Sequence, residues 1–369
     1  MEQIYFGGTI LTMEEELLAE SILVKDGWIE AVGPKEELMA SYSKAVPVDL
    51  HHCTMMPAFI DSHSHFFAVA NGYLEVDLEG VEDFQEIRER VREFIKKNQV
   101  QKGNWVKAKG YDHNTLREKK HPDRTFLDQC APDNPFVMQH KSGHVGVFNS
   151  LGLEKLGVTE DTPEPEGGRI GKANGKLTGY MEETAFVSYL RKTPIPGAEE
   201  MKRAAMKAQD FYASYGIATV QDGMSVVQMI PLYEQLIKEE KLKLDLVVYP
   251  EKNALAAFRE KMPKSYRQYH GHFKINGMKI FLDGSPQART AWMEEPYVGE
   301  TTYCGYGTME DEGVTEAFLA ADREKCQLLA HCNGDRACRQ YLECAANAKR
   351  KGADLKDMRP VMIHAQFLP

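Results

Sequence analysis

The stretch MMPAFIDSHSH at residues 55–65 is the most informative part of the chain, because an apolar run leads directly into two histidines at alternate positions. Side chains of a strand alternate between its two faces, so His63 and His65 at the end of a buried strand would point the same way. Two imidazoles on one side can share a metal ion. A histidine that ends an apolar strand is nevertheless more often a packed core residue than a ligand, so the pair needs support from elsewhere in the chain.

Two further histidines stand where apolar runs end. His331 closes the run at residues 326–331, and His364 closes the run at residues 360–364. Four histidines at the ends of expected strands favour a shared metal site over a chance pair among the 12 histidines of the chain.

The 369-residue chain has an ordinary globular composition, with 43% hydrophobic and 27% charged residues, which suffices for one large domain and a smaller one. Its formal net charge of -10 argues against nucleic acid or an anionic membrane as a partner. The sequence has no apolar window of about 18 residues and no basic-then-apolar N-terminal pattern, so we expect a cytoplasmic protein. Seven cysteines without a Cys-x-x-Cys pair indicate reduced thiols rather than disulfides or a zinc ribbon.

Residues 1–55 are expected to form a small β domain, an incomplete sandwich, in which Asp26-Gly27 joins two apolar runs as a hairpin. Over residues 56–369, short apolar runs alternate with helical patterns, as in parallel strands joined by crossover helices. One clear helix follows Glu199 and ends before Gly216. We expect about six strands, near residues 56–60, 217–222, 244–249, 277–283, 327–331 and 360–364, and a separate lobe inserted at about 66–198.

Four motifs occur in order along the chain: PAFIDSHSH at 57–65, KIFLDGS at 279–285, HCNGDRA at 331–337 and IHAQ at 363–366. Together they resemble the amidohydrolase superfamily, specifically its N-substituted formamide deformylase-like branch. The resemblance covers nearly the whole chain and implies an α/β fold, a (β/α)8 TIM barrel with metal ligands at the C-terminal ends of its strands. By this resemblance the ligands are His63 and His65 from the first barrel strand, Lys279 from the fourth, His331 from the fifth and His364 from the sixth.

The resemblance implies one or two divalent metal ions, and imidazole donors suit zinc. Bound zinc lowers the pKa of its water to about 7 and polarises a scissile carbonyl. Lys279 can contribute only if its amine is neutral or is carboxylated to a carbamate that bridges two ions, because an ammonium cannot ligate a metal. The alternatives are that Lys279 pairs with Asp283 or contacts the substrate.

Hydrolysis of this kind also needs a general base, which in the superfamily is an aspartate after the eighth strand. No residue of this sequence matches that aspartate, and the expected strands amount to an incomplete barrel. We therefore expect either a fragment or a chain that a partner completes, a homo-oligomer being one such arrangement. Asp222, Asp283 and Asp335 are strand-associated acids that could partly substitute for the base, although a loop-capping or ion-pair role is the favoured interpretation of each.

The inserted lobe contains the segment HKSGH at residues 140–144, which resembles a family segment that places a histidine near the metal pocket. His144 is accordingly a candidate substrate contact or oxyanion stabiliser, and a structural role in a glycine-containing turn is the alternative. Other residues in family-like contexts are Tyr111, Asp112, Glu183 and Arg289, the last either a substrate contact or a loop anchor.

The sequence thus predicts a metal-dependent hydrolase that cleaves a non-peptide C–N bond in a small amide, formamide or cyclic amide. His144 and Asp335 are the candidate catalytic residues beside the metal ligands. Two alternatives remain open. The chain could be a non-catalytic, truncated relative that acts by binding, or a deaminase that uses the same metal-bound water on a ring amine.

Overall fold

The structure is a computed structural model that describes residues 1–165, 167–286 and 289–368. It divides into two compact units. Unit 1 comprises Met1–Asp61 with Ala213–Thr219, and unit 2 comprises the rest of the described chain. The domain bounds expected from the sequence, at residue 55 and at 66–198 for the lobe, stay predictions.

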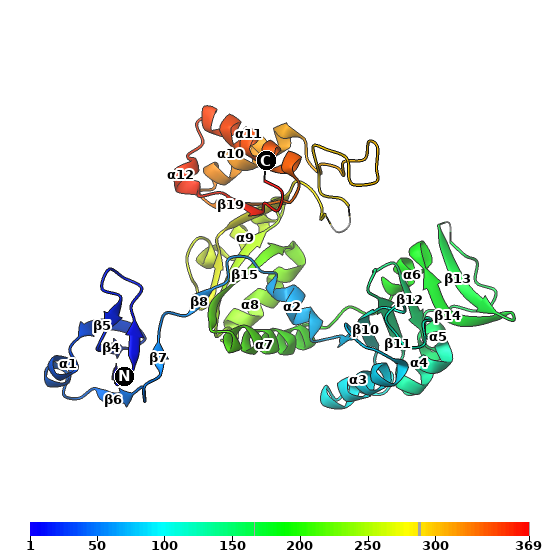
Figure 1. Ribbon diagram of the computed structural model, residues 1–369, viewed down its shortest axis with the longest axis horizontal. Helices are drawn as coiled ribbons and strands as arrows, with labels where there is room; N and C mark the ends of the chain where they lie inside the picture. Colours follow the sequence, from blue (N-terminus) through cyan, green and yellow to red (C-terminus); the bar gives the residue numbers. More distant parts are fainter. Residues whose placement is uncertain (166, 287–288, 369) are drawn as a thin grey trace. The chain divides into compact units, whose positions relative to one another are not determined.

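Unit 1 is built from short strands around a small core (Figure 1, blue). One sheet has the order β5-β4-β1-β6 and carries the helix α1 (Lys35–Ser41), and a second sheet has the order β3-β2-β7. Ile4, Leu23, Leu38 and Ala45 form the buried cluster. The strands are β1 (Glu2–Phe6), β2 (Thr9–Leu11), β3 (Leu18–Ala19), β4 (Ser21–Lys25), β5 (Trp28–Gly33), β6 (Val46–Asp49) and β7 (Thr54–Met55).

The hairpin predicted at Asp26-Gly27 is confirmed. Strands β4 and β5 pair antiparallel on either side of this dipeptide. Asp26 has φ 49° and Gly27 has φ 86°, the left-handed backbone that a tight two-residue hairpin turn requires at both positions.

The expected buried strand before the His-x-His pair is wrong. Only β8 (Phe59–Ile60) forms there, and its side chains are exposed by 54% and 74%. It pairs parallel with Ile217 and Thr219, and Pro57 cannot donate a hydrogen bond to extend the pairing. His63 and His65 therefore follow the strand in an irregular segment, so the period-two argument for their orientation does not apply.

Unit 2 contains the expected alternation of strands and helices, which confirms the α/β class. Strands β16 and β17 pair in parallel, as do β18, β19 and β20 in a second sheet. β16 and β18 are almost continuously buried, as strands of parallel sheets covered on both faces are. The strands are β15 (Ile217–Ser225), β16 (Asp245–Pro250), β17 (Phe273–Ile275), β18 (Gly277–Phe281), β19 (Gln327–Cys332) and β20 (Val361–His364).

The helices of this part separate the strands along the chain. The predicted helix before Gly216 is α7 (Ala198–Ser214), whose residues at three- and four-residue spacing are buried. Helices α10 (Asp311–Arg323) and α11 (Asp335–Arg350) pack against each other and against β19. The remaining helical segments are α2 (Phe66–Gly72), η1 (Val227–Met229), α8 (Ile230–Lys238), α9 (Leu255–Lys261), η2 (Pro263–Ser265) and α12 (Leu355–Met358).

Residues 76–190, here called the lobe, form a mixed sheet of the order β13-β14-β12-β11-β10-β9. Phe136 and Met138 belong to the buried cluster under α3 and α4, whereas Val137 belongs to the cluster under α6. Alternate side chains of β11 therefore pack on opposite faces of the sheet. The elements are β9 (Val76–Asp77), α3 (Phe84–Lys97), β10 (Val106–Tyr111), α4 (Arg124–Cys130), β11 (Phe136–His140), β12 (Val145–Phe148), α5 (Ser150–Lys155), β13 (Gly168–Ala173), β14 (Lys176–Glu182) and α6 (Glu183–Leu190).

Among the described residues, every helix is too short or too polar to cross a membrane.

We predict that Gly277→Ala destabilises unit 2. Gly277 pairs with Gln327 across β18 and β19, and an added Cβ would lie 1.8 Å from the Gln327 carbonyl oxygen. Forcing the two strands apart should lower the free energy of unfolding by about 2 kcal/mol or more, as overpacking of a core does. Gly72→Ala is the control, because its Cβ would meet no atom within 4 Å. Urea unfolding followed by circular dichroism measures the stability of both variants. Equal unfolding midpoints for the two would contradict the pairing of Gly277 with Gln327.

Candidate functional site

The structure brings the five predicted metal-binding side chains together within unit 2. The ring centroids of His63 and His65 lie 5.0 Å apart, and those of His63 and His364 lie 5.6 Å apart. His331 and His364 are separated by 4.7 Å between centroids. Lys279 Nζ is 3.5 Å from His63 Nε2. One cluster thus collects residues from the segment before α2 and from three neighbouring strands.

Parallel pairing explains why residues so distant in sequence meet. In the register of β18, β19 and β20, Phe281 lies opposite His331 and Cys332 lies opposite His364. The C-terminal ends of these strands therefore form one edge. The backbone turns sharply there, because His364 and the following Ala365 have φ values of 71° and 45°. Left-handed backbone at non-glycine residues is uncommon and concentrates at functional sites.

The segment that carries His63 and His65 is held against β15. Gly223 N donates a hydrogen bond to the Ser64 carbonyl at 2.9 Å. A Cβ on Gly223 would lie 2.5 Å from His63 Cε1, so only glycine leaves room for this imidazole. The carboxylate of Asp222 accepts a hydrogen bond from the backbone of Phe67, at the start of α2. These contacts fix the backbone on both sides of His65.

Lys279 is buried to 1% exposure beside His63. Burial lowers the pKa of its amine to about 8, which makes the neutral, nucleophilic form far more abundant near neutral pH than for an ordinary lysine. The Asp283 carboxylate, the alternative partner considered from the sequence, instead accepts hydrogen bonds from the backbone N–H groups of Trp292, Asn333 and Gly334 at 2.7–3.0 Å. Asp283 therefore orders the loop after β19.

The pKa values of three imidazoles in the cluster are lowered, so the rings of His63, His65 and His364 are neutral at pH 7. Burial, with the nearby charge of Lys279 second, lowers the pKa of His63 to about 4. Burial is also the largest cause that lowers the pKa values of His65 and His364. Neutral imidazoles keep a ring nitrogen lone pair available for a metal ion.

The ring nitrogens of this cluster do not converge on one point. His331 Nε2 faces the Gly284 carbonyl and the Asn333 side-chain amide, each at 3.1 Å. Within the described ranges, His63, His65, His331 and His364 do not supply three donor atoms that all lie within 4.8 Å of one another. The donor types, imidazoles around a buried amine, suit a zinc-type ion.

The aspartates considered as a general base are engaged in structural hydrogen bonds. Asp335 begins α11, and its Oδ1 accepts from the backbone N–H groups of Glu294 and Arg336 at 2.8 Å. Asp222 is 3% exposed, and its Oδ2 accepts from the Tyr233 hydroxyl at 2.5 Å. Burial raises the pKa of Asp222 to about 6. These contacts agree with the capping interpretation preferred from the sequence.

Two further candidates, His144 in the lobe and Arg289 in the segment after β18, are exposed. The His144 side chain is 65% exposed and pairs with Glu183 at 3.0 Å. Arg289 contacts Glu300 at 3.1 Å and donates to the Val298 carbonyl, so it anchors its own loop.

A largely buried group in the lobe contains two residues, His113 and His140, that the sequence analysis did not consider as ligands. Asp112, named there only for its family-like context, lies with them at the ends of β10 and β11, and the donor atoms of the three residues all fall within 4.8 Å of one another. The signal was available for His140, which follows the apolar run at residues 135–138, whereas His113 follows the mixed segment VKAKGYD at residues 106–112.

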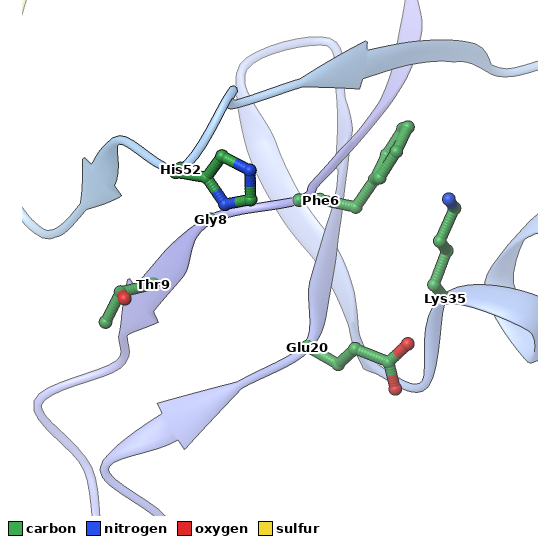
Figure 2. Close-up of a pocket in the computed structure, with 7 residues that line it drawn as sticks. Phe6, Gly8, Thr9, Glu20, Lys35 and His52 are labelled. Atoms are coloured by element: carbon green, nitrogen blue, oxygen red, sulfur yellow. The ribbon is translucent and has the colours of Figure 1, made fainter.

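Unit 1 has an open hollow of about 440 Å³ (Figure 2). It carries one acid, one lysine and one histidine, and Lys35 Nζ lies 3.8 Å from the centroid of the Phe6 ring. The lining residues are Phe6, Gly7, Gly8, Thr9, Glu20, Lys35 and His52. None of the predicted site residues is among them.

Comparison with known proteins agrees with the resemblance seen in the motifs. The YtcJ protein of Bacillus subtilis (strain 168) is 27% identical over 379 residues, covering 100% of this chain and 69% of that protein. The N-substituted formamide deformylase of Arthrobacter pascens is 34% identical over 237 residues, which cover 62% of this chain and 43% of the enzyme. A crystal structure from Pyrococcus furiosus, described as an uncharacterized metal-dependent hydrolase, superposes with a TM-score of 0.75 at 23% identity, over 95% of this chain and 71% of that one.

The structural likeness shows a shared fold, and the sequence comparison shows the family. The model of the amidohydrolase family matches residues 47–369, a span that includes the strand-end histidines, Lys279 and the whole lobe. The predicted family membership is confirmed: the chain belongs to the amidohydrolase family.

Proposed function

We propose that the chain is a metal-dependent hydrolase that cleaves a non-peptide C–N bond in a small amide, formamide or cyclic amide. The observation that carries the proposal is the cluster of four histidines around the buried amine of Lys279, in a chain of the amidohydrolase family. Similarity to a formamide deformylase supports the bond type. The chain spans 69% of the YtcJ protein and 43% of the deformylase, so activity, like the substrate class, is part of the proposal.

The proposal includes the architecture that surrounds the cluster. The strands of unit 2 would be members of a (β/α)8 TIM barrel, with the cluster at its C-terminal edge, and unit 1 would be a part of a β-sandwich. Cytoplasmic location, a small-molecule substrate and assembly into a homo-oligomer stay predictions from the sequence.

In this proposal His63, His65, His331 and His364 would hold one or two zinc ions, and Lys279 would join them as a carbamate if two are present. Zinc would supply an activated water and polarise the scissile carbonyl. The chain's own contribution is to keep the His63 imidazole neutral by burial and to hold the His63 segment against Gly223. Its Lys279 amine, deprotonated in part near neutral pH, can add carbon dioxide and release a proton.

Asp335, a catalytic candidate from the sequence, accepts two backbone hydrogen bonds through Oδ1 at the start of α11, so we assign it a capping role in this proposal. His144 stays the candidate for substrate contact, because its imidazole is largely exposed, with Nδ1 paired to Glu183 at 3.0 Å.

The engaged state of Asp222, Asp283 and Asp335 favours one second candidate function, that of a protein that binds an amide-type ligand without turning it over. Hydrolysis of any member of an amide and formamide panel by the purified full chain would exclude it. Release of ammonia from a ring amine would instead indicate a deaminase.

The first prediction of this proposed function concerns the zinc content of the protein. Protein purified from zinc-supplemented cultures should lose at least one zinc ion per chain in the His63→Ala/His331→Ala variant, because two of the four ring donors are removed. Elemental analysis measures the ratio of zinc to protein. His272→Ala is the matched control, since His272 is an exposed histidine paired with Asp245 and should leave the ratio unchanged. An unchanged zinc content in the double variant would contradict the proposed metal site.

The second prediction concerns Lys279. With a pKa of about 8, the neutral fraction of its amine should rise about 30-fold between pH 6.5 and pH 9, and carbamate formation from labelled bicarbonate should rise with it. The carbamate carbon is observed by 13C NMR on the intact chain. Lys279→Met should abolish the signal at every pH. A signal that persists in Lys279→Met, or that fails to rise above pH 7, would remove Lys279 from the proposed site.

A further inference from the structure

The lobe contains a compact group of potential ligands formed by Asp112, His113 and His140. His140 Nε2 lies 3.4 Å from Asp112 Oδ1 and 3.3 Å from His113 Nδ1. The third side of the triangle, from His113 Nδ1 to Asp112 Oδ1, measures 3.9 Å. Two ring nitrogens and one carboxylate oxygen therefore lie within 3.9 Å of one another, a closeness that no three donor atoms of His63, His65, His331 and His364 reach in the described part of the chain.

The fold creates this group at the ends of two neighbouring parallel strands. β10 and β11 pair in parallel, and the register shifts between Lys109 and Tyr111, so that Tyr111 lies opposite His140. The extra residue is Gly110, with φ 99°, and a Cβ there would lie 3.1 Å from the backbone nitrogen of Glu79. A bulge of this kind re-aims the side chains that follow it. Here it directs the next two residues, Asp112 and His113, toward the end of β11.

The dimensions of the triangle fit a transition-metal ion. Ligand atoms of a tetrahedral zinc site lie about 3.4 Å apart when each is about 2.1 Å from the metal. The circle through the three donor atoms has a radius of about 2.1 Å, so one point lies at bonding distance from all three. Two imidazoles and one carboxylate with a remaining open position are a common ligand set of zinc enzymes.

The surroundings hold the three donors in place. Asp112 and His140 are each 8% exposed. Asn114 donates to Asp112 Oδ1 from its backbone and its amide, and Lys141 Nζ lies 2.5 Å from Oδ2. These hydrogen bonds lower the pKa of Asp112, so its carboxylate is ionised. Burial lowers the pKa of His140, which keeps its imidazole neutral at pH 7.

Ser142 holds the second nitrogen of His140. The Ser142 backbone N–H donates a hydrogen bond to His140 Nδ1 at 3.1 Å, and Ser142 Oγ lies 2.9 Å from the same nitrogen. Because Nδ1 accepts here, the neutral ring carries its proton on Nε2. A metal ion at Nε2 would move this proton to Nδ1, where Ser142 Oγ would accept it in place of the donated backbone N–H, as the second N–H of a ligating histidine regularly finds an acceptor. His121 stacks on His113 at 3.9 Å between centroids and packs the outer side of the group.

We propose that Asp112, His113 and His140 bind a divalent transition-metal ion of the zinc class at a second site, within the lobe, with Ser142 as the hydrogen-bond acceptor that orients His140. This ion joins the ends of β10 and β11, and so it stabilises the lobe. The proposal uses none of the strand-end residues and does not rest on the proposed hydrolase activity.

The test isolates the lobe site in the full-length chain. The parent variant is His63→Ala/His331→Ala, stripped of metal with a chelator, so that the strand-end donors cannot account for uptake. Titration with cobalt(II), followed by its visible absorption, should show one bound ion per chain, and zinc should displace it. Addition of Asp112→Asn, or of His113→Ala with His140→Ala, should weaken cobalt binding at least about tenfold, and Ser142→Ala should weaken it by about tenfold through loss of the orienting bond.

Thermal unfolding supplies a second readout. Zinc should raise the midpoint of the parent but not that of the Asp112→Asn variant, because an ion that binds only the folded state stabilises it by mass action. His272→Ala in the parent background is the matched control and should leave cobalt binding unchanged, since it removes another histidine that pairs with an aspartate. The proposal is overturned if the parent takes up no cobalt, or if the folded Asp112→Asn and His113→Ala/His140→Ala variants bind it as tightly as the parent. Circular dichroism establishes which variants are folded.

Discussion

Burial of the Lys279 amine among imidazoles is the constraint on which the candidate site depends. A lysine at 1% exposure beside imidazoles is unfavourable in its charged form, and this is why its pKa falls to about 8. The same low-dielectric surroundings keep His63 neutral. Burial therefore favours the unprotonated form of both kinds of donor. The His63 ring keeps a nitrogen lone pair, and the Lys279 amine beside it becomes nucleophilic.

Two side-chain clusters of this chain are built by one structural rule. Neighbouring parallel strands end at the same edge, so the residues that follow them meet even when they are far apart in sequence. β18, β19 and β20 assemble Lys279, His331 and His364 in this way. β10 and β11 assemble Asp112 and His140, with a bulge at Gly110 that adjusts the direction of the side chains. In the Lys279 cluster the imidazole rings contact one another. In the Asp112 cluster the donor atoms are spaced as the ligand atoms of one metal ion are.

Aspartates and glycines near these clusters act on the backbone. Asp283 accepts three N–H groups and thereby shapes the loop after β19, next to His331. Asp222 does the same for the start of α2, next to His65. Gly223 leaves the space that the His63 ring occupies. An unpaired buried N–H is unfavourable, so each of these carboxylates stabilises a loop that would otherwise be free to move away from the site.

The sequence by itself determined the features that depend on local spacing. Alternating apolar runs and turn residues predicted the hairpin at Asp26-Gly27, the helix α7 and the α/β class. These features follow from contacts between residues close in the chain. Four ordered motifs were enough for the family. Local patterns also located His331 and His364 at strand ends, since strand ends are marked by where apolar runs stop.

Only the tertiary structure decided what depends on distant neighbours. The apolar run before His63 predicted a buried strand. In the structure only two residues of it, Phe59 and Ile60, pair with β15, and both are exposed. The direction of His331 Nε2 is set by Gly284 and Asn333, and the meeting of His113 with His140 is set by the register of β10 on β11. Ring orientation, burial and hydrogen-bond partners depend on atoms of residues that are far apart in the sequence. Folding sets the distances between these atoms, and the local sequence pattern does not specify them.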